Sequence, residues 1–447
     1  MDPRFRRNDT NERLLNRLNL CYDSILILNR IMTDQILEIL TKLISFKSIT
    51  PKSSGSIEYI AKLLQEAGFV TDIQIFGEKE ESTTNLYAKY GDSVPNICFA
   101  GHVDVVPPMH PELWISDPFK LTIDEDKIYG RGAVDMKGAI AASLLAALNY
   151  LKTNKKPNGS ISFLLTSDEE GGAKYGTKAM LEYLELKGEK IDFTILGEPT
   201  SEEEIGDTIK IGRRGSVNFD LTVQGKQGHV AYPLKAMNPV TSLVKIAADL
   251  IEVDFDAMRH CEEPQATRQS QEASSNLVVS PGIAAPSSKA RNDESSFFNK
   301  TNLEITSIDV GNNVTNIIPE TASMKFNVRF NDLHTSSSIA GIVMELIAKH
   351  EVIFDLKYRA SAESFIQTYS ARMKQFADIV AKECKLTPSI GTSGGTSDAR
   401  FIHKYSQVVE FGLNSSEAHK INEHTKISDL QRLYNVYYTS LIEFFKG

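Results

Sequence analysis

The sequence predicts an α/β protein built on a layered sheet, into which a smaller α+β domain is inserted. Three observations support this class. At 447 residues the chain is too long for one small core, so two domains are expected. Apolar runs with the length of strands alternate with helical patterns from about residue 57 to residue 200. After Gly212 the pattern changes to a strand with alternating faces, followed by further helices and strands, which indicates a second domain.

The first domain is expected to begin near Met32. Thr33 can cap a helix whose apolar side chains recur at helical spacing. A later segment rich in alanine and leucine is typical of a long buried helix. The elements expected in order are helices over 33–44 and 56–67, strands over 70–75, 84–90 and 96–100, a helix over 137–152, a strand over 161–165, a helix over 177–186 and a strand over 193–196.

The inserted domain is expected to contain both strands and helices. Its elements are a strand over 216–223, a helix over 238–250, strands over 303–308 and 322–330, a helix over 337–350 and a strand over 352–359. The chain is then divided into an N-terminal extension (1–31), a first part of the larger domain (32–213), the insertion (214–364) and a second part of the larger domain (365–447). Residues 258–296 are rich in Ser, Ala, Pro and charge, so we predict a disordered insertion there.

The composition excludes several classes of protein. The formal net charge of -9 argues against nucleic acid as a partner. The four cysteines show no CxxC spacing, so neither a disulfide framework nor a cysteine-ligated zinc is expected. No apolar run reaches the roughly 20 residues needed to span a bilayer. We therefore expect a cytoplasmic protein with no membrane partner.

Histidine and carboxylate side chains follow three of the expected strands. His102 comes after the first of them, and Asp104, two residues later, is placed to orient the imidazole ring. Glu169 and Glu170 follow the second strand and precede two glycines, and Glu198 follows the third. Sites in layered α/β folds gather at the carboxyl ends of strands. Adjacent carboxylates can divide two tasks there, because one can bind a metal while the other carries a proton.

Other candidate residues lie outside these strand ends. Asp135 stands in a glycine-rich turn before an expected helix, where it is either a helix cap or a carboxylate that bridges two metal ions. His419 lies in a late polar loop, and His424 nearby could compete for the same role, while His229 lies in the second domain. Each residue alone is more typical of a structural role. Together they supply nitrogen and oxygen ligands without thiolates, which suits a hydrolytic two-zinc site with metals roughly 3.5–4 Å apart.

The order and spacing of these motifs resemble the co-catalytic zinc aminoacylase and deacylase family, which includes acetylornithine deacetylase and carboxypeptidases. The resemblance covers about residues 33–257 and 297–445. It is carried by the motifs GHVDVV, GRGAVDMKG, SDEEGG, LGEPT, GRRGS, QGHVAYP, SGGTSDAR and HKINE. It implies a zinc-peptidase-type three-layer catalytic domain, interrupted by a smaller α+β domain for dimerisation that can act as a lid.

The resemblance also implies two zinc ions per subunit, with cobalt able to substitute at one site. The expected metal ligands are His102, Asp135, Glu170, Glu198 and His419. Asp135 is expected to bridge both ions. His419, rather than His424, matches the late ligand of the family, because the family histidine precedes the xxxE that Glu423 supplies here.

The residues with expected catalytic roles are Asp104, Glu169 and His229. Glu169 is expected to take a proton from a water activated between the zinc ions, and to pass it to the leaving amine after attack on an amide carbonyl. His229 resembles the family histidine that reaches the site from the partner subunit, where it would help to stabilise the oxyanion. The resemblance therefore implies a homodimer.

Arginines in the resembling motifs suit recognition of substrate carboxylates. The residues expected to bind the substrate are Arg213, Ser216, Tyr232, Asn316, Arg329, Thr396 and Asn414. The resemblance implies hydrolysis of N-succinyl-LL-2,6-diaminopimelate to succinate and LL-2,6-diaminopimelate, in lysine and diaminopimelate biosynthesis, as the expected reaction. The alternatives are another N-acyl-amino-acid deacylase such as acetylornithine deacetylase, a dipeptidase, and a non-catalytic relative that only binds small molecules or partners.

Overall fold

A computed structural model describes residues 30–258 and 297–446, and these form two compact units. The first unit consists of the described residues up to Gly212, Gln367–Gly391, and the residues from Ser397 onward. The second consists of the described residues of Arg213–Ile366 together with Thr392–Thr396. The predictions for residues 1–29 and 259–296 lie outside the described residues. Among the helices that are described, none is long and apolar enough to cross a membrane.

The first unit is built on an eight-stranded mixed sheet with the order β1-β2-β6-β3-β7-β18-β8-β17. Its strands are β1 (Val70–Phe76), β2 (Thr83–Tyr90), β3 (Asn96–His102), β6 (Ser160–Thr166), β7 (Phe193–Leu196), β8 (Thr208–Lys210), β17 (Ser389–Gly391) and β18 (Gln407–Glu410). The central strands β6, β3, β7 and β18 run parallel to one another. Every residue of β3, β6 and β7 is buried, as expected for parallel strands covered on both faces.

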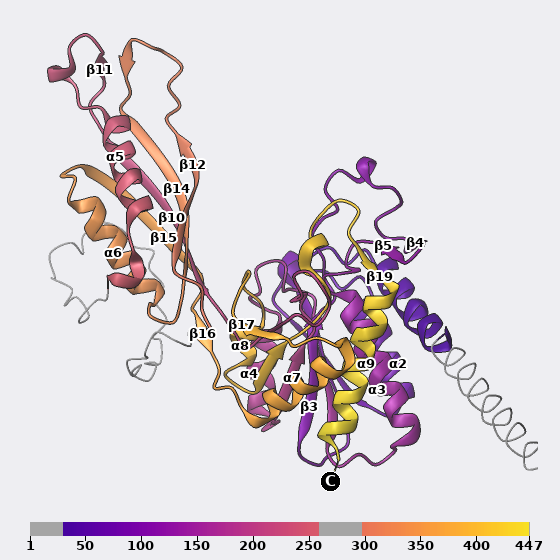
Figure 1. Cartoon of the computed structure of the whole chain (residues 1–447). Helices are drawn as coiled ribbons and strands as arrows, with labels where there is room; N and C mark the ends of the chain where they lie inside the picture. The colour runs from indigo at the N-terminus through magenta and orange to yellow at the C-terminus, as the bar shows by residue number, and fades with distance from the viewer. Residues whose placement is uncertain (1–29, 259–296, 447) are drawn as a thin grey trace, which may run out of the picture. The chain divides into compact units, whose positions relative to one another are not determined.

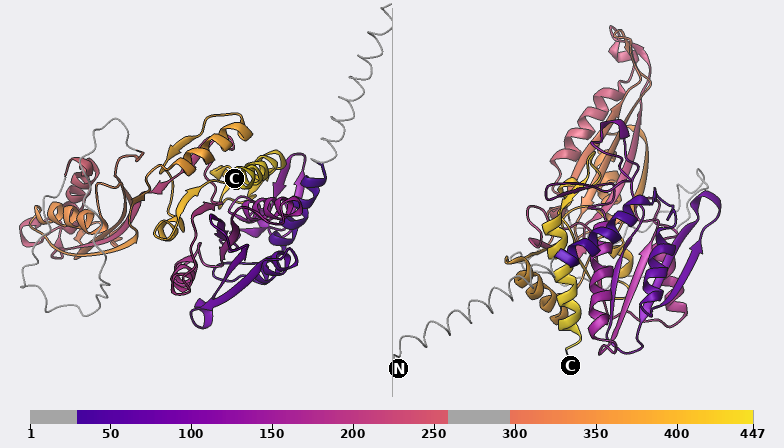
Figure 2. Two further views of the ribbon diagram at one scale, coloured as in Figure 1. Left: turned by 90° about the horizontal axis from the view of Figure 1, so that it is seen from below. Right: turned by 90° about the vertical axis from the view of Figure 1, so that its right-hand side faces the viewer.

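Helices cover both faces of this sheet (Figures 1 and 2). The helices are α2 (Ser56–Glu66), α3 (Lys137–Thr153), α4 (Thr177–Leu186), α7 (Ala371–Cys384), α8 (Ala399–Ile402) and α9 (Ile427–Phe444). On β1, Gln65 of α2 hydrogen-bonds to Thr71, whereas Tyr183 of α4 hydrogen-bonds to Asp72. Because neighbouring strand residues point to opposite faces, α2 and α4 lie on opposite sides of the sheet. Helix α9 packs beside α3 and α7, and α8 packs beside α4, which completes three layers.

The first described helix differs from the expectation. It spans residues 30–45, so Thr33 lies within the helix rather than capping it. The Thr33 hydroxyl instead accepts a hydrogen bond from the side chain of Gln431 in α9. The apolar face that predicted the helix is present, because Ile36, Leu40 and Leu43 are buried.

A small three-stranded sheet, which the sequence did not predict, joins distant parts of the first unit. It consists of β4 (Thr122–Asp124), β5 (Lys127–Tyr129) and β19 (His424–Lys426). The antiparallel pairing of β19 with β5 anchors the late polar segment beside the glycine-rich turn that follows Tyr129. Strands of three residues carry too little periodicity to be recognised in a sequence.

The second unit is a four-stranded antiparallel sheet with two helices on one face. The strand order is β12-β14-β10-β15. The elements are β10 (Gly215–Gln224), β12 (Asn302–Asp309), β14 (Thr321–Phe330), β15 (Ile353–Ala362), α5 (Pro239–Glu252) and α6 (Ser336–Ala348). Inward-facing residues such as Phe219 and Phe326 are buried with Leu243 of α5 and Ile339 of α6. Alternate residues of β10 are exposed, which accounts for the alternating pattern in the sequence.

Residues 392–396 depart from the expected division of the chain, which assigned residues 365–447 to the larger domain. They belong to the second unit. The Arg213 guanidinium donates hydrogen bonds to the carbonyls of Ser393 and Gly395, and the Thr392 hydroxyl donates to the carbonyl of Phe297. These contacts attach the loop, which includes Thr396, to the second unit.

Candidate active site

Three neighbouring parallel strands deliver polar side chains to one edge of the sheet. His102 ends β3, Glu169 and Glu170 follow β6, and Glu198 follows β7. Because β6 and β7 flank β3 in the same direction, the ends of all three strands meet at one edge. The polar cluster therefore arises from strand order, which the sequence pattern alone does not specify.

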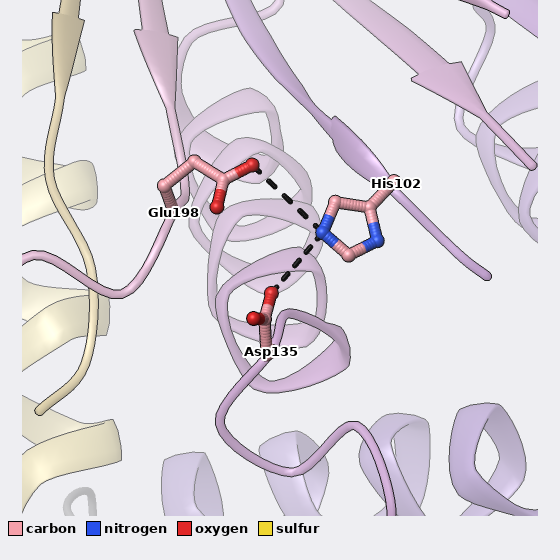
Figure 3. A group of neighbouring side chains, drawn as sticks. All are labelled: His102, Asp135 and Glu198. Carbon is pink, nitrogen blue, oxygen red and sulfur yellow. Dashed lines mark hydrogen bonds and ion pairs between the residues drawn. The ribbon is translucent and has the colours of Figure 1, made fainter. Parts of the chain in front are cut away.

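His102, Asp135 and Glu198 form a compact group at this edge (Figure 3). The Nε2 atom of His102 is 3.1 Å from Oδ1 of Asp135 and 3.8 Å from Oε1 of Glu198. On its other side the ring donates from Nδ1 to the main-chain carbonyl of Asp104 at 3.0 Å. That bond holds the ring in place and leaves Nε2 facing the two carboxylates, where it could bind a metal ion once deprotonated.

Asp135, Glu170 and His419 form a second group that shares Asp135 with the first. The Nε2 atom of His419 is 2.9 Å from Oε1 of Glu170 and 3.3 Å from Oδ2 of Asp135. The two oxygens of Asp135 therefore face two different histidines. The groups differ in exposure, because the side chain of His102 is 1% exposed and that of His419 is 51% exposed.

Asp135 is not a helix cap, which was the structural alternative. The residue before α3 is Met136, and no side chain caps the helix there. Asp135 ends a tight turn in which Gly132 has a φ of +87°, a conformation that favours glycine. The turn leaves the Asp135 carboxylate free of capping contacts and directed at the histidines.

Carboxylates dominate the charge of this edge. They raise the pKa of His419 to about 10, through its hydrogen bond to Asp135 first and its hydrogen bond to Glu170 second. Burial lowers the pKa of His102, but Asp135 and Glu198 outweigh it and hold that pKa well above its usual value. Burial, and then the charge of Glu198, raises the pKa of Glu169 well above its usual range. A site that holds protons this strongly favours the binding of cations in their place.

The Asp104 carboxylate was expected to orient the ring of His102, but its contacts differ. Its carboxylate is 3.7 Å from Nδ1 of His102, which is too long for a hydrogen bond. It accepts instead the main-chain N–H groups of Glu169 and Glu170, with the shortest contacts at 3.2 and 3.1 Å. The main-chain carbonyl of Asp104 orients the ring, and its buried carboxylate positions the loop of the two glutamates.

His424 is excluded from the second group by its contacts. Its ring lies against Tyr129 with centroids 4.9 Å apart, and its Nδ1 donates to the carbonyl of Asn422. The late imidazole beside Asp135 is therefore that of His419, as the resemblance implied.

The remaining expected substrate-binding residues are divided between the units. Asn414 lies in the first unit, where its amide donates to the carbonyls of Glu202 and Glu203 and accepts from the N–H of Ser416. Both of its donors are thus already used, which does not favour the expected substrate contact. The others belong to the second unit and are Arg213, Ser216, Tyr232, Asn316, Arg329 and Thr396, together with His229. Their roles stay predictions.

Glu423 and Arg131 are buried at this edge and were not among the expected site residues. The Arg131 guanidinium donates to the Glu423 carboxylate at 2.7 Å, and both side chains are at most 2% exposed. Their motifs were visible in the sequence, as the arginine of GRGAVD and the glutamate of HKINE. Nothing in the sequence pairs them, because they lie 292 residues apart.

The donor set fits a pair of divalent metal ions. Within each group, one ligand atom from every residue lies within 4.8 Å of the others. Imidazole nitrogens and carboxylate oxygens without thiolates are the ligands of hydrolytic zinc sites. A shared carboxylate between two such groups matches the arrangement in which two ions lie roughly 3.5–4 Å apart.

A layered α/β sheet with two histidine-carboxylate groups that share one aspartate defines the class of the two-metal hydrolases. The particular family follows from comparison with known proteins. The chain belongs to peptidase family M20/M25/M40, whose pattern matches residues 98–443. The predicted family, the α/β zinc-peptidase-type fold class and the expectation of a hydrolase are thereby confirmed.

Similar proteins support this membership along most of the chain. The chain is 53% identical to a succinyl-diaminopimelate desuccinylase of Rickettsia bellii over 90% of its length and 95% of the relative. It is 52% identical to the protein of the same name from Rickettsia felis, over 90% and 98% of the two chains.

Solved structures show the same fold. An M20 family metallo-carboxypeptidase from Sulfolobus solfataricus matches with a TM-score of 0.68 and 21% identity, covering 91% of this chain and 98% of the other. A dinuclear metal-binding peptidase of the M20 family from Bacillus subtilis matches with a TM-score of 0.61 and 14% identity, over 93% and 99%.

Proposed function

We propose that this protein hydrolyses N-succinyl-LL-2,6-diaminopimelate to succinate and LL-2,6-diaminopimelate, as a two-zinc amidohydrolase of lysine and diaminopimelate biosynthesis. The observation that carries the proposal is the 53% identity, over 90% of the chain, to relatives named for this reaction. The two ligand groups around Asp135 supply the chemistry that the reaction requires. The proposed cellular location is the cytoplasm, in keeping with a biosynthetic role.

The metal ligands in this proposal are His102 and Glu198 for one ion, Glu170 and His419 for the other, and Asp135 for both. Two zinc ions held there would polarise the amide carbonyl and lower the pKa of a water molecule. Cobalt is proposed as a substitute at one site, because it accepts the same nitrogen and oxygen ligands.

Glu169 is the proposed general base. Its neighbour Glu170 belongs to a ligand group, and Asp104 holds the main-chain N–H groups of both residues. Glu169 accepts the proton of the attacking water as the C–O bond forms. It then donates that proton to the amine nitrogen as the C–N bond breaks, which releases the diamine and the succinate carboxylate.

Arginines of the second unit are the proposed carboxylate contacts. Burial, and then the nearby charge of Arg214, lowers the pKa of Arg329. In the described part of the chain, no carboxylate forms an ion pair with either guanidinium. Two close, partly buried guanidiniums that have no carboxylate partner among the described residues favour a ligand that carries carboxylates, as this substrate does.

The expected substrate contacts of the second unit form two separate groups. Ser216 and Arg329 are paired across β10 and β14 at the start of β10. His229 lies on β11 (Gly228–His229), beyond the far end of β10, and pairs with β13 (Ile317–Ile318). The length of β10, with nine steps of ~3.3 Å, puts about 30 Å between the two ends. One small substrate cannot touch both groups of one chain, which supports a homodimer in which each subunit supplies His229 to its partner.

The His229 side chain is prepared to donate a hydrogen bond. Its Nδ1 accepts the N–H of Ala231 at 3.1 Å, so the proton of a neutral ring is on Nε2. The surrounding loop exposes Val230, Tyr232 and Leu234. An exposed apolar loop that carries a polar donor is typical of an interface, and it supports the proposed role of His229 at the oxyanion of a partner subunit.

Steady-state kinetics with purified, zinc-loaded protein test the substrate. We expect kcat/KM for N-succinyl-LL-2,6-diaminopimelate to exceed that for N-acetylornithine by at least about 100-fold, because the Arg214 and Arg329 guanidiniums, which have no carboxylate partner among the described residues, penalise a ligand with fewer carboxylates. A preference for the acetyl substrate would assign the protein to the deacetylases. Turnover of dipeptides alone would assign it to the dipeptidases.

A further inference from the structure

The Glu423 carboxylate receives four hydrogen bonds from the turn that carries Asp135. Its Oε2 accepts from Arg131 Nη1 at 2.7 Å and from the N–H of Gly132 at 2.9 Å. Its Oε1 accepts from the N–H of Val134 at 2.8 Å and from the N–H of Asp135 at 3.1 Å. The side chain is fully buried, so these bonds are shielded from water. Hydrogen bonds to a buried carboxylate are among the strongest in proteins, and they hold the turn in one position.

The segment that carries Glu423 also carries His419. The main-chain carbonyl of Glu423 accepts the N–H of Gly130 at 3.0 Å, and β19, which follows directly, pairs with β5. Asn422 accepts the N–H of Ile115 through its side chain at 2.8 Å. These further contacts of the segment 419–426 involve no residue of the ligand groups.

This arrangement links two ligands that belong to the same group. His419 and Asp135 come from loops far apart in the sequence, and their side chains approach to 3.3 Å. The side chain of His419 is half exposed, and its ion pairs are with Asp135 and Glu170 of the same ligand group. The distance between the two ligands therefore depends on how the segment 419–426 is held against the Asp135 turn, and the Glu423 carboxylate is the strongest of those connections.

We propose that Glu423 is a positioning residue for the two-metal centre: it holds Asp135 at a fixed distance from His419 and so determines the affinity of the Asp135–Glu170–His419 group for its metal ion. The inference rests on the metal centre of the proposed function and is independent of the substrate. Glu423 itself touches no ligand side chain and takes no part in proton transfer. The His102 and Glu198 side chains depend on it only through Asp135.

The charge and both oxygens of Glu423 are needed for this role. Four donors converge on two carboxylate oxygens. A glutamine has one acceptor oxygen and an amide group that donates, so one pair of donors in the turn would face a donor instead of an acceptor. The buried Arg131 would also lose its counter-ion. The turn is then expected to shift away from the segment that carries His419.

The test compares metal binding to the full-length wild-type protein with that to Glu423→Gln and Glu423→Asp. Glu417→Gln is the matched control, because Glu417 is a partly exposed acid of the same loop that does not contact the Asp135 turn. Metal-stripped proteins are titrated with Zn²⁺ by calorimetry, and the Co²⁺-loaded forms are compared by electronic absorption. For E423Q we expect one ion to bind about 10–100-fold more weakly, as for other residues that orient ligands, with the Co²⁺ spectrum altered. E423D keeps the charge, so we expect an intermediate affinity. E417Q should match the wild type.

The outcomes separate this inference from the proposed function. Failure of the wild-type protein to bind two ions overturns both. Binding of two ions by the wild type and by folded E423Q, with equal affinities and equal Co²⁺ spectra, overturns the positioning role alone. Failure of both Glu423 variants to fold, as seen by circular dichroism, also overturns it, because Glu423 would then serve the fold rather than the metal centre.

Discussion

Replacing Asp104 by Asn tests how the Glu169–Glu170 loop is held. The Asp104 carboxylate accepts the N–H groups of both glutamates and is fully buried. Asn keeps the shape and can still accept through its oxygen, but it removes the charge. A hydrogen bond to a charged group contributes roughly 1 kcal/mol more than a neutral one, so two N–H groups lose about 2 kcal/mol. At 1.36 kcal/mol per tenfold in rate, kcat/KM should fall about 30-fold.

Metal content distinguishes two roles of the Asp104 carboxylate: holding the Glu169–Glu170 loop, as the structure indicates, and orienting the ring of His102, as the sequence suggested. The ring of His102 is oriented by the main-chain carbonyl of Asp104, which the substitution leaves in place. We therefore expect D104N to retain both metal ions while turnover falls. If the carboxylate oriented the ring instead, the ion at His102 would be lost.

The assay measures kcat/KM on N-succinyl-LL-2,6-diaminopimelate, and elemental analysis measures the metal content. Asp192→Asn is the control, because Asp192 accepts the N–H of Asn96 at the opposite end of β3. Thermal unfolding measures how much the substitution lowers the free energy of unfolding, and so separates an effect on stability from an effect on the rate. A D104N enzyme with kcat/KM within about threefold of wild type would refute the reasoning.

The other predictions concern the proposed base, the proposed late ligand and the proposed dimer. Glu169→Gln should lower kcat by about 10²–10⁴ with metal retained, as measured by kinetics and elemental analysis, and near-normal turnover would remove the assignment of the base. His419→Asn should lose one metal ion, whereas His424→Asn should keep both, because the contacts of His424 with Tyr129, Asn422 and Glu417 lie outside the ligand groups; equal metal content in the two variants contradicts this. Mixing inactive Glu169→Gln with inactive His229→Gln should restore up to roughly a quarter of wild-type activity, since half of randomly paired dimers contain one complete site. A mass-tagged partner shows whether subunits have exchanged. If they have exchanged and no activity returns, a contribution of His229 across the interface is excluded.

The sequence predicted most of the fold because its elements carry strong local patterns. The expected helix over 177–186 and strand over 193–196 match α4 and β7 residue for residue. The long helix α3 is buried along most of its length, as its alanine and leucine content indicated. The misses are elements without such patterns. Strands β4, β5 and β19 have three residues each, and the cap at Thr33 failed because the helix begins earlier.

The candidate site was predictable only in part. Its residue types, and their positions at strand ends, could be read from the chain, because a strand end after an apolar run is a local feature. The contacts that correct the expectations are not local. The main-chain carbonyl of Asp104, rather than its carboxylate, accepts the hydrogen bond of the His102 ring. The side-chain amide of Asn414 donates to the main chain of a loop more than 200 residues away.

By itself the sequence determined the α/β class, the family resemblance and the set of acids and imidazoles that could bind metal, because local patterns and motif spacing encode these. The tertiary structure decided how the ligands are grouped. The order of β6, β3 and β7 in the sheet brings the first ligands to one edge. The pairing of β19 with β5 and the four hydrogen bonds of Glu423 then bring a segment near the end of the chain to Asp135. Such long-range pairings depend on packing and buried charge, and no local pattern in the sequence encodes them.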